Sequence, residues 1–539
     1  MNTQPRRRKI SLISALAALA IALPLSLQVA AEGTATSTTA VVGPTQIVRV
    51  PTPTLSDRNR LAKLNLDFAG TVGRSAIDVV VDSAAVKTRL KRAGFTWTVV
   101  VEDVEAAEQE RIRADKAYAA AKPGGSALPS GRTTYRTLAD YEAEMATLVS
   151  RYPTQVRLLT LNHSSLEGRP IHGIEVGTAV NTDDGRPTFL VMGEHHAREW
   201  PSAEVTMEFA YDLLQTGTAR TQNILDNARV VFVPVVNPDG FEVSRSGDYE
   251  LKRKNCRLVD GQLPAPGACA LRDNRPFGTD PNRNYGAKWG GPGSSFLVDS
   301  EIYAGAGPFS EPEVQNIREL ISSRQVVGHI SNHTYSALVL RPPGYAADGL
   351  AYDEELLRSL GDQMAAEMGY QSIYGWQLYD TTGTTEDWSY SATGGLGFTF
   401  ELGTNGFHPR FATVIPLYLG HTKKVPNGGI REALFIAAES AINNARHSVI
   451  EGSAPAGATL RLTKTFPTST WSGSTFTDTL DDTMVVPASG SWTWHVNPST
   501  RPAVAAANGT EAWTLTCGGQ TLPVTVDRGE LVNVGTLTC

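Results

Sequence analysis

The most constraining feature of the chain is a long stretch, from about residue 135 to residue 448, in which short apolar runs rich in β-branched residues alternate with amphipathic helical runs. Residues 202–214 and 311–323 are two of the helical runs. Strands that alternate with helices in this way are typical of layered α/β domains. We therefore predict a fold of the α/β class, with a mixed, twisted sheet flanked by helices.

Four of the apolar runs lead directly into polar side chains. The runs are residues 188–192, 230–236, 326–330 and 397–400, and the polar residues that follow them include, in this order, His196, Asn237, His333 and Glu401. In open α/β sheets, ligand sites form beyond the carboxyl ends of the strands. These side chains are therefore candidates for one shared site.

A His-x-x-Glu pair, His196 and Glu199, follows the first of these runs. A spacing of three residues within one turn brings an imidazole and a carboxylate to the same side, and zinc binds both groups. Catalytic zinc takes three protein ligands, and His333 is the best candidate for the third because it follows another strand. His195 stands one position out of register, with Arg198 three residues later, so we expect a structural or solvent-facing role for it.

Glu401 directly follows the apolar run 397–400. A carboxylate in such apolar surroundings is unusual, because burial of an unpaired charge is costly and Glu is rarely buried without a partner. A bound metal ion would supply that partner.

Five short motifs carry a family resemblance. They are the stretches 196–200 (HAREW), 237–241 (NPDGF), 280–284 (DPNRN), 332–335 (NHTY) and 398–402 (FTFEL). In this order they resemble the funnelin metallocarboxypeptidases, the family of the pancreatic carboxypeptidases A and B, over about residues 131–445. The resemblance implies a carboxypeptidase A-like fold and an enzyme that removes single residues from the C-terminal ends of peptides.

The resemblance also implies one zinc ion (Zn²⁺) per catalytic domain, held by His196, Glu199 and His333. It makes Asp280 the acceptor that orients His196, and Glu401 the general base that takes a proton from water. The physical reading agrees, since a carboxylate beside a metal-activated water can pass that proton to the leaving amine.

Arg253 corresponds to the family's arginine that stabilises the oxyanion of the reaction. Its neighbourhood departs from the family pattern, because Lys252 stands where the pancreatic enzymes have Trp and Glu250 where they have Arg. The register of Arg253 is therefore less well determined than that of the zinc ligands.

Four further residues are expected to bind the substrate. Asn282 and Arg283 resemble the family's clamp for the terminal carboxylate, which an arginine can bind through two parallel hydrogen bonds. Tyr379 aligns with the mobile tyrosine that closes over bound substrate, and a packed core aromatic is the alternative. Arg198 is expected to face the cleft as a substrate contact, or else to pair with a nearby carboxylate.

Glu386 aligns with the floor of the pocket that receives the C-terminal side chain. A carboxylate there favours a basic side chain, so we predict removal of C-terminal Lys and Arg. Thr384, Thr385 and Thr399 leave the walls of this pocket without charge, so we also expect removal of apolar C-terminal residues. The alternative is that Glu386 turns away to solvent.

The first residues of the chain predict export. Residues 6–9 are basic, residues 10–27 form an apolar run and small residues stand at 29–31, which is the pattern of a secretory signal peptide at residues 1–31. An uncleaved membrane anchor is the alternative, although Pro24 interrupts the run. We predict a secreted, extracellular protein that has no membrane partner once the signal is removed.

Residues 32–130 resemble the inhibitory pro-segment of the family by their position and their βαβ pattern. The expected strands are residues 46–50, 76–82 and 96–102, the expected helices are residues 84–94 and 103–122, and a linker with Pro and Gly follows at 123–131. An activating protease is expected to cut in this linker. A permanently attached accessory domain is the alternative.

The catalytic domain is expected at residues 131–450, and a C-terminal all-β sandwich at residues 451–539, where Thr, Ser, Val and Trp alternate with period two. We expect its four tryptophans to pack its core rather than to bind a polymer; they are Trp471, Trp492, Trp494 and Trp513. Two local disulfides are expected, which fits export: Cys256 with Cys269 and Cys517 with Cys539.

The net charge of -7 and the pI near 5.9 argue against a nucleic-acid partner, because phosphate binding needs a basic surface. The predicted partners are peptide or protein C-termini and an activating protease, and we expect a monomer. Two other functions stay open, namely a peptidase of cell-wall stem peptides with the same zinc site and a secreted, catalytically inactive binding protein.

Overall fold

The computed structural model describes residues 43–404, 406–423 and 425–539. The signal peptide predicted at residues 1–31 therefore lies outside the described residues. Within the described ranges, no helix combines the length and the apolar character that crossing a membrane requires.

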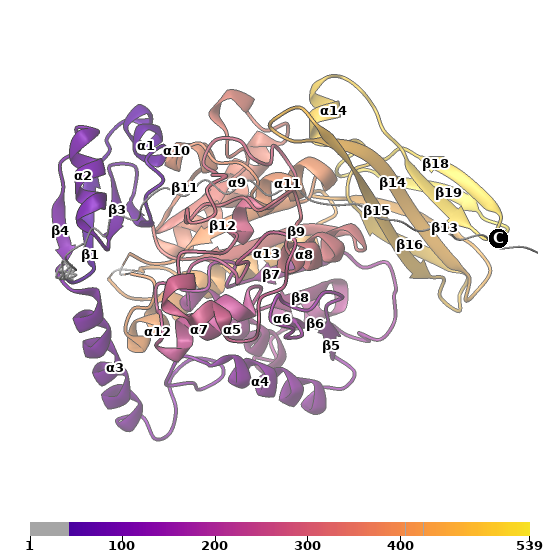
Figure 1. Cartoon of the computed structure of the whole chain (residues 1–539). Coiled ribbons are helices and arrows are strands. Elements are labelled where there is room, and N and C mark those ends of the chain that lie inside the picture. The colour runs from indigo at the N-terminus through magenta and orange to yellow at the C-terminus, as the bar shows by residue number, and fades with distance from the viewer. Residues whose placement is uncertain (1–42, 405, 424) are drawn as a thin grey trace, which may run out of the picture. The chain divides into compact units, whose positions relative to one another are not determined.

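An eight-stranded sheet forms the centre of the molecule (Figure 1), with the strand order β11-β10-β12-β9-β7-β8-β6-β5. Its strands are β5 (Val156–Thr160), β6 (His172–Val176), β7 (Thr188–Met192), β8 (Arg229–Val233), β9 (Val326–His333), β10 (Leu338–Arg341), β11 (Gln371–Tyr374) and β12 (Leu396–Glu401). The pairs β7–β8, β7–β9, β9–β12 and β10–β11 are parallel, whereas β5–β6, β6–β8 and β10–β12 are antiparallel. The predicted α/β class with a mixed sheet is confirmed.

Most helices of the chain belong to the same region as this sheet. They are α4 (Leu138–Arg151), α5 (Pro201–Gln215), α6 (Ala219–Asn227), α7 (Pro238–Ser246), α8 (Pro312–Ser322), α9 (Glu354–Met368), α10 (Gly375–Leu378), α11 (Thr385–Thr393), α12 (Val414–Leu419) and α13 (Gly429–Ala441). The helices predicted at 202–214 and 311–323 are α5 and α8. Pro at the first helical position starts both of them, where its missing N–H costs nothing.

The two faces of the sheet bury two different cores, because successive side chains of a strand point to opposite faces. On β7, Phe189 and Val191 pack in the core that contains residues of α5, α9 and α13. Leu190 and Met192 pack in a second core that contains residues of α8, α11 and the C-terminal strands. The buried strands are therefore apolar on both faces, which explains why they read as continuous apolar runs in the sequence.

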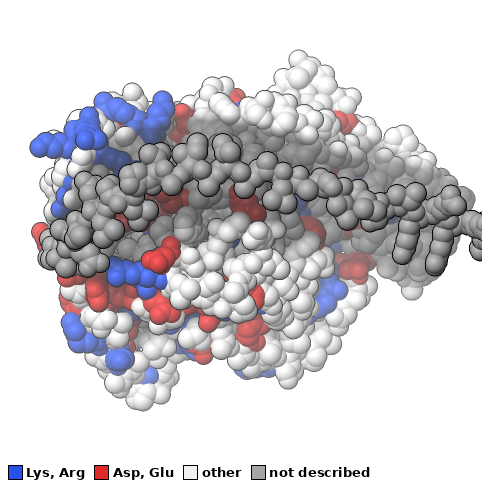
Figure 2. Space-filling model, in the orientation of Figure 1, with Lys and Arg blue, Asp and Glu red and all other residues white. Residues whose placement is uncertain are grey.

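Residues 46–101 form a small antiparallel sheet of order β2-β3-β1-β4 with two helices. The elements are β1 (Gln46–Pro51), α1 (Leu55–Ala62), β2 (Phe68–Val72), β3 (Ala76–Val81), α2 (Ala84–Arg92) and β4 (Thr98–Val101), and the long helix α3 (Val104–Ala120) follows. Lys and Arg side chains gather over α1 and α2 (Figure 2), and the last turn of α2 contains Arg89, Lys91 and Arg92. The sequence predicts all these elements except α1 and β2.

The C-terminal residues form two facing sheets, of orders β16-β13-β19 and β15-β14-β17-β18. The elements are β13 (Ser448–Ser453), β14 (Thr459–Ser469), β15 (Thr475–Val485), β16 (Ser491–Val496), α14 (Pro502–Ala506), β17 (Trp513–Cys517), β18 (Gln520–Val524) and β19 (Leu531–Thr536). Three of the four tryptophans are buried as expected, whereas Trp471 is 45% exposed. Both predicted disulfides are present, Cys256–Cys269 and Cys517–Cys539.

Candidate active site

The carboxyl ends of β7 and β9 bring His196, Glu199 and His333 together. The two strands are parallel neighbours in which Met192 pairs with Ser331, so the residues that follow them lie at one edge of the sheet. His333 is the last residue of β9, and His196 and Glu199 lie between β7 and α5. The N–H of Glu199 donates to the carbonyl oxygen of His196 at 3.1 Å, so the pair lies in a tight turn that precedes the helix.

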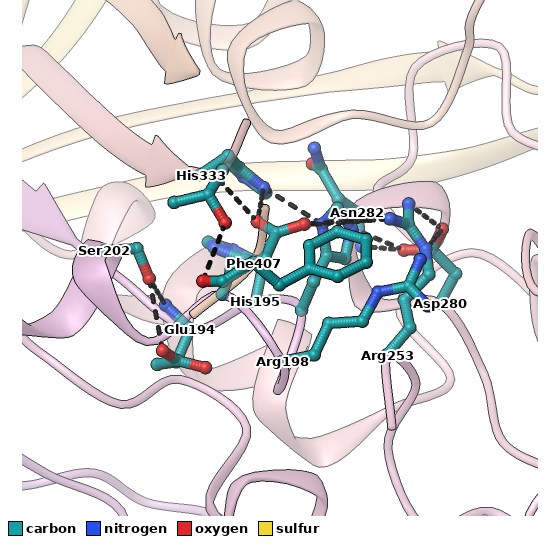
Figure 3. A network of polar contacts seen from close by, with 12 residues as sticks. Glu194, His195, Arg198, Ser202, Arg253, Asp280, Asn282, His333 and Phe407 are labelled. Carbon is teal, nitrogen blue, oxygen red and sulfur yellow. Dashed lines mark hydrogen bonds and ion pairs between the residues drawn. The ribbon is translucent and has the colours of Figure 1, made fainter. Parts of the chain in front are cut away.

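The ligand atoms of these three buried residues converge on one point, as the contacts around His333 in Figure 3 illustrate. Nδ1 of His196 lies 3.0 Å from Nδ1 of His333 and 2.9 Å from Oε1 of Glu199. Nδ1 of His333 lies 3.0 Å from Oε2 of Glu199. Such separations fit tetrahedral zinc, in which bonds of about 2 Å place neighbouring ligand atoms roughly 3.3 Å apart.

A second polar group holds the outer nitrogen of each imidazole. Nε2 of His196 lies 3.1 Å from Oδ1 of Asp280, and Nε2 of His333 lies 3.0 Å from Oγ of Ser331. Metal-binding histidines commonly have such a contact, because it fixes the tautomer and the ring orientation. The residues present therefore fit a zinc ion bound through the two Nδ1 atoms and the Glu199 carboxylate.

His195 points away from this cluster. Its Nε2 lies 2.9 Å from the hydroxyl of Tyr285 and its Nδ1 3.3 Å from Oγ of Ser331. The imidazole is fully buried, and this burial lowers the pKa of His195 well below its ordinary value. Its position is that of a structural residue, one of the two roles expected from the sequence.

Glu401 is the last residue of β12 and pairs with His333 on the parallel neighbour β9. It lines the same cavity as His196 and Glu199. Burial and the neighbouring Glu199 raise the pKa of Glu401 well above its ordinary value. A cation bound at the ligand cluster would offset this unfavourable environment for the carboxylate.

Arg253 and Asp280 lie beside the ligand cluster (Figure 3). Nε and Nη2 of Arg253 donate to Oδ2 of Asp280 at 3.2 and 2.7 Å, and Nη1 lies 3.2 Å from Nδ1 of His196. Burial alone would lower the pKa of Arg253, but Asp280 and Glu199 raise it above its ordinary value. Lys252 points elsewhere and donates to the carbonyl oxygen of Phe277 at 2.6 Å. The substitution of the family's Trp by Lys252 therefore does not move Arg253 away from the ligand cluster.

The predicted carboxylate clamp lies in the same cavity. Asn282 and Arg283 belong to a short 3-10 helix, Pro281–Arg283, and Arg283 donates to the hydroxyl of Tyr379 at 3.2 Å. Another nitrogen of Arg283 donates to the carbonyl oxygen of Gly293 at 2.8 Å. Oδ1 of Asn282 accepts from the N–H of Thr385 at 3.0 Å. The structure thus places all three predicted residues beside the ligand cluster.

Glu386 lies in the first turn of α11 and lines the cavity. It is only 5% exposed, and its Oε2 accepts a hydrogen bond from Oγ1 of Thr399 at 3.1 Å. Burial raises the pKa of Glu386 above its ordinary value, although Thr399 acts in the opposite direction. The side chain therefore faces the site and not the solvent.

The cavity is small, about 90 Å³, and residues 66–71, which are the first part of β2 and the two residues before it, form part of its lining. The carboxylate of Asp67 accepts from both terminal nitrogens of Arg198, at 2.9 and 2.6 Å. The ring of Phe68 meets the ring of Tyr379 edge-on, with centroids 5.6 Å apart. Of the two roles expected for Arg198, the structure thus shows the ion pair.

Strand β2 packs directly against the segment that follows His333. The N–H of Thr71 donates to the carbonyl oxygen of Tyr335 at 3.4 Å and to Oγ of Ser336 at 3.1 Å. At Gly70 a Cβ atom would lie 2.4 Å from the Tyr335 carbonyl oxygen, so only glycine allows this close approach. Neither β2 nor the role of Asp67 is predicted from the sequence, where the local signal is only an acid between two apolar residues, Leu66 and Phe68.

Two histidines and a glutamate at the strand ends of a mixed α/β sheet are the ligand set of a candidate metalloenzyme, and comparison with known proteins identifies the family. The sequence profile of the zinc carboxypeptidases matches residues 141–422. Carboxypeptidase A1 of Sus scrofa is 32% identical over 377 residues, which cover 66% of this chain and 83% of that protein. The zinc carboxypeptidase of Saccharothrix mutabilis subsp. capreolus is 28% identical over 450 residues, which cover 78% of this chain and 98% of that protein.

A solved structure agrees with this result at the level of the fold. The crystal structure of carboxypeptidase A from Helicoverpa armigera matches with a TM-score of 0.61 at 22% identity, and the match covers 75% of this chain and 98% of that chain. The chain belongs to the zinc carboxypeptidase family. It is accordingly a hydrolase of a family that acts on the C-termini of peptides.

Proposed function

We propose that this chain hydrolyses the last peptide bond of peptides and proteins with one zinc ion held by His196, Glu199 and His333. The support is the convergence of these three side chains beside a cavity that is lined by His196, Glu199 and Glu401 and by two guanidinium groups, those of Arg253 and Arg283. Together they provide a metal site, a base and two cationic contacts within reach of one peptide terminus.

When it is bound, zinc supplies Lewis-acid chemistry, since it polarises a carbonyl group and lowers the pKa of water. Glu401 accepts the proton of the attacking water and delivers it to the nitrogen of the leaving amino acid. Arg253 donates hydrogen bonds to the carbonyl oxygen as negative charge develops on it. Asp280 holds Arg253 through Oδ2 and His196 through Oδ1, so one carboxylate orients both groups.

The remaining residues of the cavity select the substrate. Arg283 and Asn282 bind the free terminal carboxylate, which limits the enzyme to the ends of chains. Tyr379 closes over the bound substrate from its position beside Arg283. Glu386 receives a basic C-terminal side chain, while the neutral hydroxyl of Thr399 beside it leaves room for apolar side chains.

We propose further that residues 32–130 are an inhibitory pro-segment, followed by the catalytic domain at 131–450 and the C-terminal sandwich at 451–539. The support is the position of β2 in the cleft, where Asp67 pairs with Arg198. Once the pro-segment leaves, Arg198 becomes available to bind the substrate. The two disulfides support an extracellular location, because disulfides persist in oxidising compartments.

The linker after α3 limits where an activating protease can cut. Residues 121–124 are exposed. Further along, Leu128 is buried, and both the N–H and the hydroxyl of Ser130 donate to the carboxylate of Glu208. Cleavage is therefore expected at residues 121–124, so that the anchored end of the linker, up to residue 130, stays on the catalytic domain when the rest of the pro-segment leaves.

The proposed function is tested with the cleaved protein and matched peptides that end in Arg, Lys or Phe, each with a free or an amidated C-terminus. We expect release of single residues from the free peptides alone, one zinc ion per chain by elemental analysis and loss of activity with a chelator. Glu401→Gln should keep its zinc and lose about 10²–10⁴-fold in kcat. Glu355→Gln, on the surface of α9, is the matched control. Full activity in Glu401→Gln would contradict the proposed base.

A further inference from the structure

We propose that the C-terminal sandwich supports the substrate side-chain pocket from outside through its contacts with α11, and that Asp478 on β15 is a positioning residue for this pocket. This role rests on the proposed function of Glu386 as the floor of the pocket. Asp478 does not touch the cavity itself. It acts through the helix that carries Glu386.

The carboxylate of Asp478 is 1% exposed and accepts hydrogen bonds from three side chains. Arg318 of α8 donates through Nε at 3.1 Å and Nη2 at 2.6 Å, and Thr468 of β14 donates at 2.6 Å. The indole Nε1 of Trp388 donates at 3.1 Å. A buried carboxylate with this many donors has a fixed orientation, because each contact restricts it from a different element.

Trp388 connects Asp478 to the pocket. It lies on α11 two residues after Glu386, and it is fully buried. Its ring contacts Phe309, with centroids 5.1 Å apart, and Phe309 in turn contacts Phe476 of β15 at 5.7 Å. The rotation of α11, and with it the direction of the Glu386 carboxylate, therefore depends on side chains of the C-terminal sandwich.

The same contacts reach the carboxylate clamp and the metal ligands. The ring of Trp388 stacks on Tyr285, with centroids 6.0 Å apart, and Tyr285 lies two residues after Arg283. The hydroxyl of Tyr285 contacts His195 at 2.9 Å. His195 shares Ser331 with the zinc ligand His333, so a continuous set of buried contacts runs from Asp478 to the ligand cluster.

A second connection runs through the tip of the β14–β15 hairpin. The N–H of Lys288 donates to the carbonyl oxygen of Ser469 at 3.1 Å, and the N–H of Trp471 donates to the carbonyl oxygen of Trp289 at 3.0 Å. The same loop ends at Gly293, whose carbonyl oxygen binds Arg283. The ring of Trp471 lies against Gly291, so this contact buries one part of the ring and leaves the rest exposed.

Asp478→Asn is the sharpest test, because the amide keeps the shape but turns an N–H toward at least one of the present donors. In the zinc-loaded, activated chain we expect KM for peptides ending in Arg to rise at least about tenfold with kcat little changed, and the Arg-to-Phe ratio of kcat/KM to fall. Trp388→Phe keeps an aromatic ring but removes the N–H together with the five-membered ring of the indole, so it should shift the ratio in the same direction. Asp481→Asn is the control on the same strand, because its carboxylate pairs with Arg461 at the surface.

Hydrogen exchange on the uncut chain provides a readout independent of activity. Amides of α11 should exchange at least about tenfold faster in Asp478→Asn than in the parent, whereas amides of α9 should not change. If Asp478→Asn does not fold, Trp388→Phe decides. The role of Asp478 would be overturned if hydrogen exchange in α11 were unchanged and the Arg-to-Phe ratio of kcat/KM stayed within twofold of the parent. An equal loss of kcat for all peptides would also overturn it. A parent chain inactive on every peptide would instead contradict the proposed function, and the exchange data would still test Asp478.

Discussion

The ion pair between Asp67 and Arg198 gives a quantitative test of the proposed inhibition. Arg198 is fully buried, and the Asp67 carboxylate is 15% exposed, so the pair is largely removed from water. The two hydrogen bonds, at 2.9 and 2.6 Å, hold the guanidinium in a forked arrangement. The ring of Phe407 lies 4.0 Å below the same guanidinium. Arg198 therefore has no access to water while β2 remains in place.

Asp67→Ala removes the carboxylate partner of this guanidinium in the closed chain, which keeps only its hydrogen bonds to the carbonyl oxygens of Leu251 and Phe68. Removal of one partner of a buried pair typically costs about 3–5 kcal/mol, and we take about 3 kcal/mol because Asp67 is partly exposed. Since about 1.4 kcal/mol corresponds to a factor of ten, the ratio of open to closed chains should rise roughly 100-fold. If about one uncut chain in a thousand is open in the parent, roughly one in ten is open in the variant.

The assay compares hydrolysis by the uncut and the cleaved forms of the parent and of Asp67→Ala. We expect the uncut variant to be roughly 100-fold more active than the uncut parent. After cleavage and removal of the pro-segment the two enzymes should be identical, because Asp67 is then no longer part of the enzyme. Glu105→Gln, an exposed residue of α3, controls for loss of a charge in the same region. Equal activities of the two uncut chains would refute this role of Asp67.

Two further predictions concern buried glutamates. Glu386→Gln removes the charge of the pocket floor but not its shape, so kcat/KM for peptides ending in Arg should fall about 10–100-fold while the value for Phe changes little; an unchanged Arg preference would exclude Glu386 as the specificity residue. The pKa of Glu313 is raised to about 8, first by burial and then by Glu311 and Asp239. The folded chain therefore binds more protons than the unfolded chain between about pH 4.5 and pH 8, and stability falls as the pH rises through this window. Glu313→Gln should reduce this fall by up to about 3.5 kcal/mol in urea denaturation at pH 5 and pH 8, and an identical pH profile would show that Glu313 does not titrate there.

Four inner strands of the central sheet, β7, β8, β9 and β12, and the residues at their ends could be predicted because both leave a local mark in the sequence. The run predicted at residues 188–192 is β7 to the residue, since a strand buried on both faces is apolar throughout. His196 follows β7 and His333 is the last residue of β9, and the two lie close together because β7 and β9 are parallel neighbours. The short motifs that contain these two histidines then show where the candidate site residues lie along the chain.

The contacts that close the cleft could not be predicted in this way. Strand β2 is short and lies at the edge of its sheet, so it has little apolar periodicity, and its partner Arg198 lies more than a hundred residues further along the chain. A carboxylate next to Phe68 does not reveal which of many arginines it meets. Pairing across such a separation depends on how the two sheets pack, and a single sequence contains no record of that packing.

Asp478 is an intermediate case, because the sequence holds a signal that the packing then explains. In β15 the side chains of Asp478, Leu480 and Met484 share the buried face, while the residues between them are mostly exposed or half-buried. An acid in the buried phase of an alternating strand must find donors, since an unpaired buried carboxylate is costly. The alternation thus predicts that Asp478 has partners, but that they are Arg318 and Trp388 follows only from the packing of β15 on α8 and α11. A sandwich attached only by a flexible linker would not need a buried acid on its contact face, and this is the strongest reason to propose that the C-terminal strands support the substrate pocket through α11.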